Sequence, residues 1–248
     1  MKLLYKEKKL NFEGHDVKYI LEKNKNSNDL IIVFSGIPRP GIKARYNYMR
    51  TLEKVNVNKL YILDDLGFDK RGGYYLGKNK EFYMERAVLK LINEIKKDNL
   101  INRTIYCGSS KGGWAAIYFG IRDYGSTIIA GSLQYILGDY VTSNERIKEN
   151  LMKFVMGKNY TNEDVDFLNS LLSKTIQNYS DNQNDIWLHY SDSEYTYDDH
   201  MVYLLEDLKK LNMEYSEDVA HYEKHGDLSL HFPPFLINTI KKIVRNAS

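Results

Sequence analysis

Short apolar runs alternate with longer amphipathic segments along most of the chain. The runs have the length and residue types of buried strands, and they cover residues 29–34, 59–63, 104–107, 127–130 and 186–190. The longer segments are typified by residues 80–98, where Val88, Leu91, Ile92 and Ile95 recur at helical spacings. Strands that alternate with helices of ten or more residues predict βαβ units and a mostly parallel sheet.

The same pattern places further elements toward both ends of the chain. They are an antiparallel pair of edge strands, a last strand and three helices, predicted at 3–9, 16–22, 214–222, 114–119, 198–211 and 227–244. Two helical segments, near 144–156 and 162–176, interrupt the alternation. We therefore predict a single doubly wound α/β domain over 1–248, with helices on both faces of the sheet and a small helical cap within about 142–178.

Composition and charge exclude several classes of protein. The 248 residues include 35 Lys and Arg against 33 Asp and Glu, a net charge of +2, which argues against a general nucleic-acid binder. The single cysteine, Cys107, permits no internal disulfide, so a reducing, cytoplasmic compartment is expected. No apolar stretch has the length of a signal peptide or a membrane span. There is no H-E-x-x-H or C-x-x-C motif, so no metal site is predicted.

The segment from Gly108 to Gly113 carries the candidate chemistry. It reads GSSKGG and fits the pattern G-x-S-x-G with Ser110 at its centre. A predicted strand precedes it and a predicted helix follows, which is the context of a nucleophile elbow, where a serine on a tight turn projects above the sheet edge. The alternatives are a phosphate-binding glycine loop or a plain turn, but the spacing of a Walker A loop is missing.

A nucleophilic serine needs a base, and hydrolases with such an elbow supply the triad in the order Ser, acid, His. His225 follows the last predicted strand and precedes the last helix, where the base belongs. His221, at the end of that strand, and His231, inside the helix, are the alternatives. His189 falls inside a predicted strand and His200 on a predicted helix.

The acid is expected just past the strand at 186–190. Asp192 and Glu194 both lie there. Many hydrolases of this fold show a small residue, two spacers and then the acid, and Ser191 to Glu194 matches that pattern. We favour Glu194, with Asp192 as the alternative. The acid would hold the imidazole tautomer and stabilise the imidazolium.

Two backbone donors are needed to bind the oxyanion. The N–H of Lys111 directly follows the nucleophile, and the loop after the strand at 29–34 offers the second donor. Pro38 has no N–H, so Ile37 is the better candidate. Basic side chains in loops on this side are candidates to meet a phosphate or carboxylate of a substrate, namely Arg39, Lys43, Arg45 and Arg71. Four tyrosines are candidates to stack on a sugar, namely Tyr74, Tyr75, Tyr195 and Tyr197.

Several of these segments together resemble the α/β-hydrolase-like proteins of bacterial surface glycan assembly. That group includes capsule polysaccharide O-acetyltransferases, capsule proteins of the XcbB/CpsF type and the acetyltransferase-like subunit of the accessory Sec system. The matching segments read FSG, RYNY, RGGYYLG, GSSKGG, EYTYDDH and HGD, at 34–36, 45–48, 71–77, 108–113, 194–200 and 225–227. The resemblance spans about residues 30–235 and implies an α/β-hydrolase-like fold.

The resemblance also implies a function. In such proteins a serine is acylated and passes an acetyl group to a sugar hydroxyl. Carried over by motif, the roles fall on Ser110, Glu194 and His225, with Ile37 and Lys111 as oxyanion donors. Acetyl-CoA is then the expected donor, with no tightly bound cofactor, and a glycan or polysaccharide is the expected acceptor. Capsule-assembly proteins are possible partners.

Two other functions remain open from the sequence. An esterase or deacetylase would use the same triad with water as the second nucleophile. A non-enzymatic subunit of a glycan assembly or export system would need no intact triad. The tyrosines near the expected mouth of the site favour the transferase.

Overall fold

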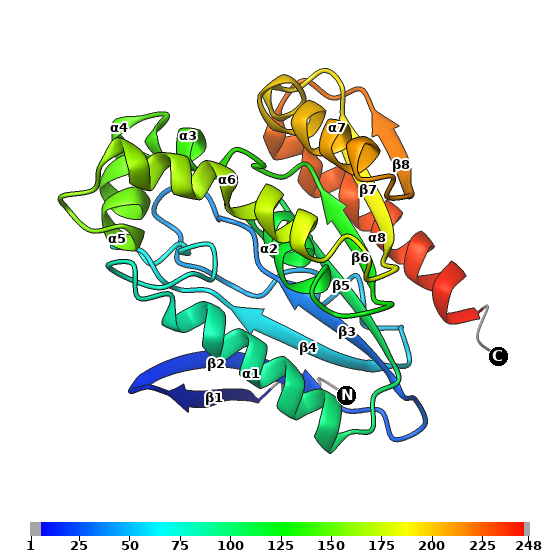
Figure 1. Ribbon diagram of the computed structural model, residues 1–248. Helices are drawn as coiled ribbons and strands as arrows, with labels where there is room; N and C mark the ends of the chain where they lie inside the picture. Colours follow the sequence, from blue (N-terminus) through cyan, green and yellow to red (C-terminus); the bar gives the residue numbers. More distant parts are fainter. Residues whose placement is uncertain (1–5, 246–248) are drawn as a thin grey trace.

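The computed structural model describes residues 6–245 of the chain. Within them, eight strands form one sheet in the order β1-β2-β4-β3-β5-β6-β7-β8 (Figure 1). The strands are β1 (Glu7–Phe12), β2 (His15–Glu22), β3 (Asp29–Phe34), β4 (Asn58–Leu63), β5 (Arg103–Ser109), β6 (Thr127–Gly131), β7 (Asp185–Ser191) and β8 (Tyr215–Ala220). The strands from β4 to β8 are parallel, and β2 is antiparallel to both β1 and β4. The predicted antiparallel edge is therefore confirmed, although residues 3–5 of its first strand lie outside the described residues.

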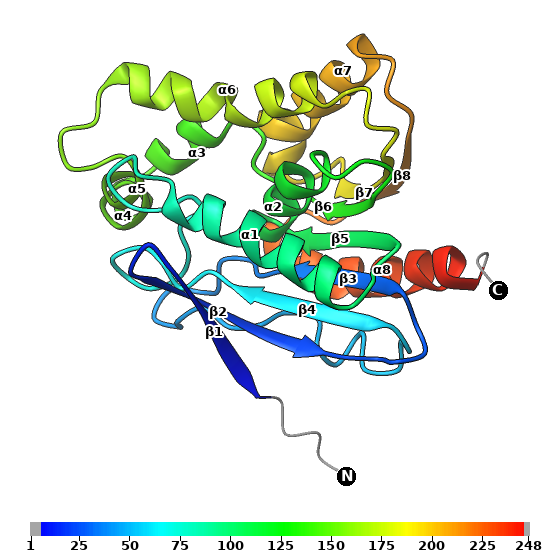
Figure 2. The ribbon, with the colours of Figure 1, turned by 60° about the horizontal axis from the view of Figure 1, so that its bottom comes forward.

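Helices cover both faces of the sheet, as Figure 2 shows for α8 on one side and α1 and α2 on the other. The helices are α1 (Tyr83–Asp98), α2 (Lys111–Gly120), α3 (Leu137–Thr142), α4 (Glu145–Ile147), α5 (Lys153–Val155), α6 (Asn162–Asn178), α7 (Val202–Lys210) and α8 (Leu228–Arg245). Two π-helical turns, η1 (Lys148–Met152) and η2 (Tyr197–Met201), and a 3₁₀ turn, η3 (His225–Asp227), join them. Each predicted segment thus has its element, but a π-helical turn interrupts the predicted helix at 144–156, and another begins the one at 198–211.

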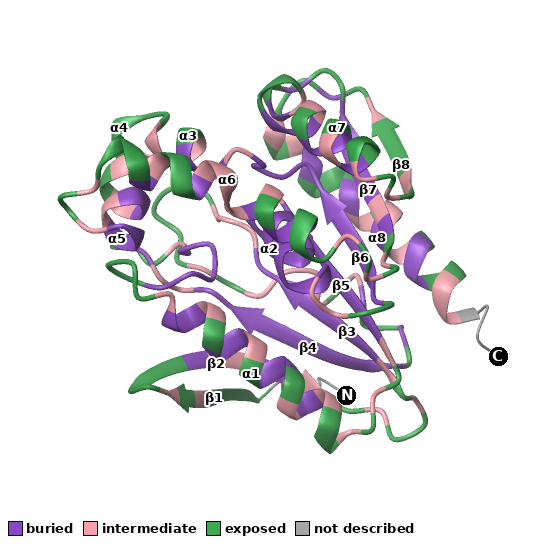
Figure 3. Ribbon diagram, viewed as in Figure 1, coloured by how far each residue is buried: buried purple, intermediate pink, exposed green. Residues whose placement is uncertain are grey.

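The central strands are buried on both faces, which explains their unbroken apolar sequence (Figure 3). Along β3, Leu30, Ile32 and Phe34 pack toward α1 and α2, whereas Ile31 and Val33 pack toward α8. This alternation follows the two-residue period of a strand. The two resulting cores fix the relative positions of the strand ends, where the candidate residues lie.

The segment between β6 and β7 carries α3 to α6. Helices α4 to α6 fall within the predicted 142–178, whereas α3, before it, was not predicted. Helix α6 packs against α3 and α2, and it lies over α2 in Figure 1. Between residues 6 and 245, no helix combines the length and the apolar character needed to cross a bilayer.

Candidate active site

Ser110 stands on a strained turn between β5 and α2. Its backbone has φ of 53° and ψ of −125°, a combination that non-glycine residues rarely adopt. The flanking glycines permit the turn because there is no room for a side chain. A Cβ on Gly108 would lie 2.4 Å from the carbonyl oxygen of Gly112, and one on Gly112 would lie 2.6 Å from that of Phe34. This is the geometry expected of a nucleophile elbow.

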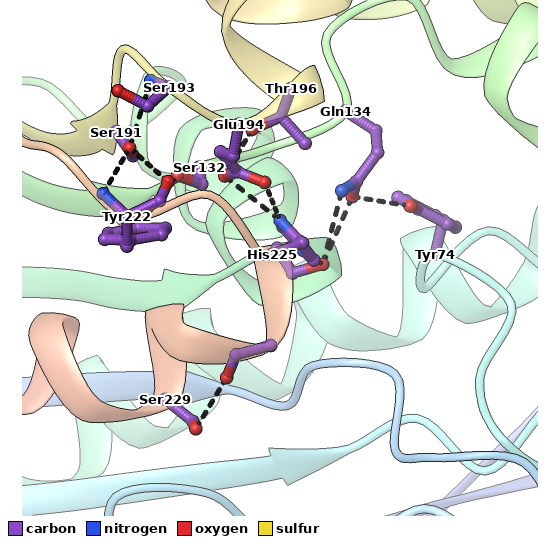
Figure 4. A network of polar contacts seen from close by, with 12 residues as sticks. Tyr74, Ser132, Gln134, Ser191, Ser193, Glu194, Thr196, Tyr222, His225 and Ser229 are labelled. Atoms are coloured by element: carbon purple, nitrogen blue, oxygen red, sulfur yellow. Dashed lines mark hydrogen bonds and ion pairs between the residues drawn. The ribbon is translucent and has the colours of Figure 1, made fainter.

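The structure brings Ser110, His225 and Glu194 together. His225 Nε2 lies 3.0 Å from Ser110 Oγ, and His225 Nδ1 lies 2.9 Å from Glu194 Oε2. Figure 4 shows the imidazole of His225 pointing toward Glu194 from the start of α8. The three residues follow β5, β7 and β8, whose carboxyl ends meet at one edge of the parallel sheet. The distances match a nucleophile, a base and an orienting carboxylate.

Glu194 is buried, and its carboxylate is held by more than one donor. Thr196 Oγ1 donates to Oε1 at 2.6 Å, and His225 Nδ1 lies 3.2 Å from Oε1 and 2.9 Å from Oε2. Burial by itself raises the pKa of Glu194, but the hydrogen bond and charge of His225, with Thr196, outweigh it and leave the pKa below its usual value. Glu194 is therefore ionised at neutral pH, as an orienting acid must be.

The alternative acid and an alternative base contact each other instead. Asp192 Oδ1 lies 2.7 Å from His221 Nδ1, and both side chains are exposed. His231 stacks on the ring of Tyr222, and His189 binds Asp218 on the outer strand β8. Among the histidines considered from sequence, the structure thus places His225 alone against Ser110 within the described residues.

One candidate oxyanion donor directly follows the nucleophile in the chain, and the other lies in a loop beside it. Lys111 is the first residue of α2, so its N–H has no partner within the helix. The loop of Ile37 lines the same hollow as Ser110 and His225, which has a volume of about 430 Å³. Within residues 6–245, neither the N–H of Ile37 nor that of Lys111 makes a hydrogen bond. Both remain free to receive a developing negative charge.

The side chain of Lys111 turns inward and forms a fully buried ion pair. Its Nζ lies 2.7 Å from Asp64 Oδ2, with both side chains 0% exposed, and 4.4 Å from the ring centre of Tyr75. Asp64 also accepts hydrogen bonds from the N–H groups of Gly73 and Tyr75, at 2.8 and 3.1 Å. Burial lowers the pKa of Lys111, and the charge of Asp64 opposes that effect. The pair ties the turn after Ser110 to the 71–77 segment.

Tyr74 and Tyr75 correct the sequence interpretation, because both rings are buried in the core and offer no surface to a sugar. The hydroxyl of Tyr75 accepts from the N–H of Ser35 at 2.6 Å and donates to the carbonyl of Ile62 at 3.0 Å. Ser35 directly precedes the loop that carries Ile37. Tyr75 therefore holds the start of the loop of one candidate donor, and the ion pair holds the side chain of the other candidate, Lys111.

Gln134 is a site residue that sequence reasoning missed. Its Nε2 lies 3.3 Å from Ser110 Oγ, and the buried hydroxyl of Tyr74 donates to its Oε1 at 2.9 Å. In Figure 4 the amide of Gln134 lies between His225 and Tyr74. Ser110 Oγ also donates to Oε1 at 3.4 Å, so both polar atoms of the amide lie within reach of the nucleophile. No motif marks Gln134, which lies in the loop after β6.

The two arginines named from sequence differ in their surroundings. Arg71 donates from Nε and Nη2 to the carbonyl of Pro38, at 2.9 and 2.5 Å, and from Nη1 to Asp69. The guanidinium therefore holds the loop that carries Ile37, and its contact with a substrate stays a prediction. Arg39 is exposed and lines the hollow beside Ser110, together with Arg45.

The remaining aromatic candidates lie nearer the surface. Tyr195 is 47% exposed, and its ring centre lies 5.6 Å from that of His225. Tyr197 stacks on Tyr190. Within residues 6–245, no three His, Cys, Asp or Glu side chains are grouped so that they could hold a metal ion.

Comparison with protein-family models and with curated protein sequences finds no match. Comparison with solved structures finds similar proteins over nearly the whole chain. The capsule O-acetyltransferase of Neisseria meningitidis serogroup A superposes with a TM-score of 0.79 at 21% identity, over 97% of this chain and 96% of that one. The fluorophosphonate-binding serine hydrolase F of Staphylococcus aureus superposes with a TM-score of 0.65 at 11% identity, over 97% and 98%. The chain has the α/β-hydrolase fold.

The glycosylation-associated Gap123 complex of Streptococcus agalactiae is also similar. It gives a TM-score of 0.74 at 16% identity, over 97% of this chain but 46% of that one. The predicted likeness to proteins of surface glycan assembly is therefore confirmed at the level of structure. In this α/β-hydrolase fold, the chain order Ser110, Glu194, His225 is the one that the fold imposes on its triads.

Proposed function

We propose that this protein is a serine-dependent O-acetyltransferase that moves an acetyl group from acetyl-CoA to a hydroxyl of a bacterial surface glycan such as capsular polysaccharide. The observation that carries the proposal is the contact of Ser110 with His225 and of His225 with Glu194, at 3.0 and 2.9 Å on a strained elbow. The structural likeness to a capsule O-acetyltransferase supports this reaction, and a mutant of that enzyme was solved in complex with CoA.

In the first half-reaction, His225 Nε2 takes the proton of Ser110 as Oγ attacks the acetyl carbonyl carbon. The N–H groups of Ile37 and Lys111 bind the oxyanion. The bond to sulfur breaks, CoA leaves as a thiol after protonation by His225, and acetyl-Ser110 remains. Glu194 stabilises the imidazolium that forms in between.

In the second half-reaction, a sugar hydroxyl attacks the acetyl-serine. His225 takes the hydroxyl proton and returns it to Ser110 Oγ as the ester bond breaks, which regenerates the free enzyme. The exposed Arg39, in the hollow beside Ser110, is suited to the phosphates of the donor. A cytoplasmic location and contacts with capsule-assembly proteins remain predictions.

An esterase or deacetylase is the second candidate. It is favoured by the likeness to serine hydrolases, which extends over 97% of this chain. The same triad serves both reactions, and only the second nucleophile differs. A non-enzymatic subunit, suggested by the likeness to part of the Gap123 chain, would leave the contact between Ser110 and His225 without a use.

One experiment separates the three functions. Purified protein and its Ser110→Ala variant are incubated with acetyl-CoA or with p-nitrophenyl acetate, with and without a panel of capsular polysaccharides. The transferase requires turnover that depends on the polysaccharide, and the esterase requires turnover in water alone. Ser110→Ala should lower the rate by at least about 10³-fold. Equal rates for the two proteins would refute both enzymatic functions.

A further inference from the structure

A second hollow, of about 770 Å³, shares no lining residue with the first. Residues of α3 and α4 form one side of it, and residues 195–203 form the other. It reaches the triad through two neighbours. Tyr195, which lines it, follows Glu194 and lies beside the ring of His225. Ile136, which also lines it, is two residues from Gln134, the amide that contacts Ser110.

The polar groups of this second hollow are acidic or neutral. Its lining includes the carboxylates of Asp139 and Asp199, and no Lys or Arg among the described residues. Asp139 gives one oxygen to the amide of Asn169 at 2.8 Å, and its other oxygen has no partner within residues 6–245. The first hollow has the opposite charge. Arg39 and Arg45 line it, and no Asp or Glu among the described residues does. A phosphate or carboxylate is attracted to the first hollow and repelled from the second.

The hollow is also lined by aromatic residues of the kind that stack on sugars, and by a histidine. Tyr140, Tyr195 and Tyr203 contribute three aromatic rings, and Tyr195 and Tyr203 are 47% and 48% exposed. His200 lies at the base, 3% exposed, and burial lowers its pKa to about 4, so it is neutral at pH 7. Its Nδ1 accepts from the N–H of Ile136 at 3.3 Å. The proton of the neutral ring is therefore on Nε2, which is left as a hydrogen-bond donor.

We propose that this second hollow is the acceptor site and that it takes an uncharged sugar unit. Aromatic rings cover the apolar faces of the sugar, while Asp139 and Asp199 accept bonds from its hydroxyls. Tyr195 lies between the bound sugar and His225, so a hydroxyl entering past this ring meets the acetyl-serine and the base together. The inference rests on the proposed function, because an acceptor is needed only if Ser110 carries an acyl group.

Binding is tested first on the Ser110→Ala protein, so that the result does not depend on catalysis. Saturation-transfer NMR and calorimetry use four probes, which are the tetramers of glucose, galactose, N-acetylglucosamine and galacturonic acid. We expect at least one neutral tetramer to bind at least about tenfold more tightly than the galacturonic acid tetramer. Adding Tyr203→Ala should weaken that binding about tenfold, through loss of stacking. The matched control Tyr124→Ala removes a tyrosine that is 67% exposed and lines neither hollow, and it should leave binding unchanged.

Tighter binding of the anionic tetramer, or no binding of any neutral tetramer, overturns the assignment. Equal losses for Tyr203→Ala and Tyr124→Ala overturn it as well. The outcome for the proposed function is read separately, by mass spectrometry of the wild-type protein after mixing with acetyl-CoA. If acetyl-Ser110 forms but sugar binding does not depend on Tyr203, the acceptor site is rejected and the acetyltransferase stands. Sugar binding without acetyl-Ser110 rejects the acetyltransferase while the sugar site stands.

Discussion

The buried ion pair of Lys111 and Asp64 should be among the most costly interactions to break in this protein. Asp64→Asn removes one charge with almost no change of shape and leaves the ammonium of Lys111 fully buried without a counter-charge. Removing one partner of a buried pair costs about 3–5 kcal/mol, because the remaining charge is no longer compensated. We expect the free energy of unfolding of Asp64→Asn to fall by about that amount.

Removing the other partner of the pair, by Lys111→Met, should lower the free energy of unfolding by less. Asp64 keeps three backbone donors, the N–H groups of Leu66, Gly73 and Tyr75, whereas Lys111 has no ionic partner besides Asp64 among the described residues. The double variant, Asp64→Asn with Lys111→Met, leaves no buried charge. Its stability should therefore exceed that of Asp64→Asn alone, although it carries one more substitution.

The pH dependence has a definite sign. In Asp64→Asn the pKa of Lys111, which burial already lowers, must fall further because the opposing charge is gone. At pH values between this lowered pKa and the ordinary lysine pKa of 10.5, the unfolded chain binds more protons than the folded one. The stability of the variant therefore rises with pH in that range. The gap between wild type and Asp64→Asn should narrow between pH 7 and pH 10.

Urea unfolding followed by the fluorescence of the buried Trp114 measures these differences, provided that the dependence on urea concentration keeps the same slope. Glu94→Gln is the matched control, because its partner Lys90 lies on the exposed face of α1, where such pairs contribute about 0.3–0.5 kcal/mol. A loss below about 1 kcal/mol for Asp64→Asn, or a double variant less stable than Asp64→Asn, would refute the argument from an uncompensated charge.

Three further predictions concern the site and its surroundings. Glu194→Gln should lower the rate of serine acylation, measured as the burst of p-nitrophenol from p-nitrophenyl acetate, by about 10²–10⁴-fold. Asp192→Asn, at the surface, should change that rate less than twofold. The pKa of His200 falls from 6.5 to about 4 on folding, so acidification from pH 6.5 to about 4 should lower the stability of the wild-type protein by up to about 3 kcal/mol. His200→Gln should lack this loss in urea unfolding at several pH values. Equal pH dependence of stability in the two proteins would contradict the prediction. Gly112→Ala should lower the stability by about 1–3 kcal/mol, because its Cβ would lie 2.6 Å from the carbonyl oxygen that ends β3, while Gly226→Ala, with open space around it, should leave the melting temperature nearly unchanged.

The sequence was sufficient to predict the sheet and the three residues that meet at its edge. Buried parallel strands are apolar throughout, so β3, β5 and β6 are visible as runs, and loops at their carboxyl ends converge whatever the loops contain. The GSSKGG motif identified Ser110, and its place between the last strand and the last helix identified His225. Choosing Glu194 over Asp192 depended on spacing alone, and the structure agrees because Asp192 faces outward to His221.

The residues behind the site were not predictable in the same way. Gln134 lies in a loop with no motif, and its orientation depends on a hydroxyl that is 60 residues away in the chain. Tyr74 and Tyr75 follow a strand whose carboxyl end lies at the mouth of the site, and the sequence carries no signal that both rings turn into the core. Their burial depends on Asp64, which draws the backbone of this segment inward through two N–H groups.

That misjudged segment explains why a lysine can follow the nucleophile at a buried position. A long cationic side chain next to Ser110 would, if exposed, enter the space needed by the substrate. Asp64 draws it inward, Gly72 leaves room for it since a Cβ there would lie 2.6 Å from Nζ, and Tyr75 covers it while reaching Ser35 with its hydroxyl. The ion pair thus connects the turn after Ser110 to the segment of Tyr75, and the Tyr75 hydroxyl connects that segment to Ser35, just before the loop of Ile37. Loss of the Tyr75 hydroxyl should disturb the loop of Ile37, a proposed oxyanion donor, before it affects the contact between Ser110 and His225. Tyr75→Phe should therefore lower kcat for an oxygen ester more than for the matched thionoester, whose sulfur accepts hydrogen bonds poorly.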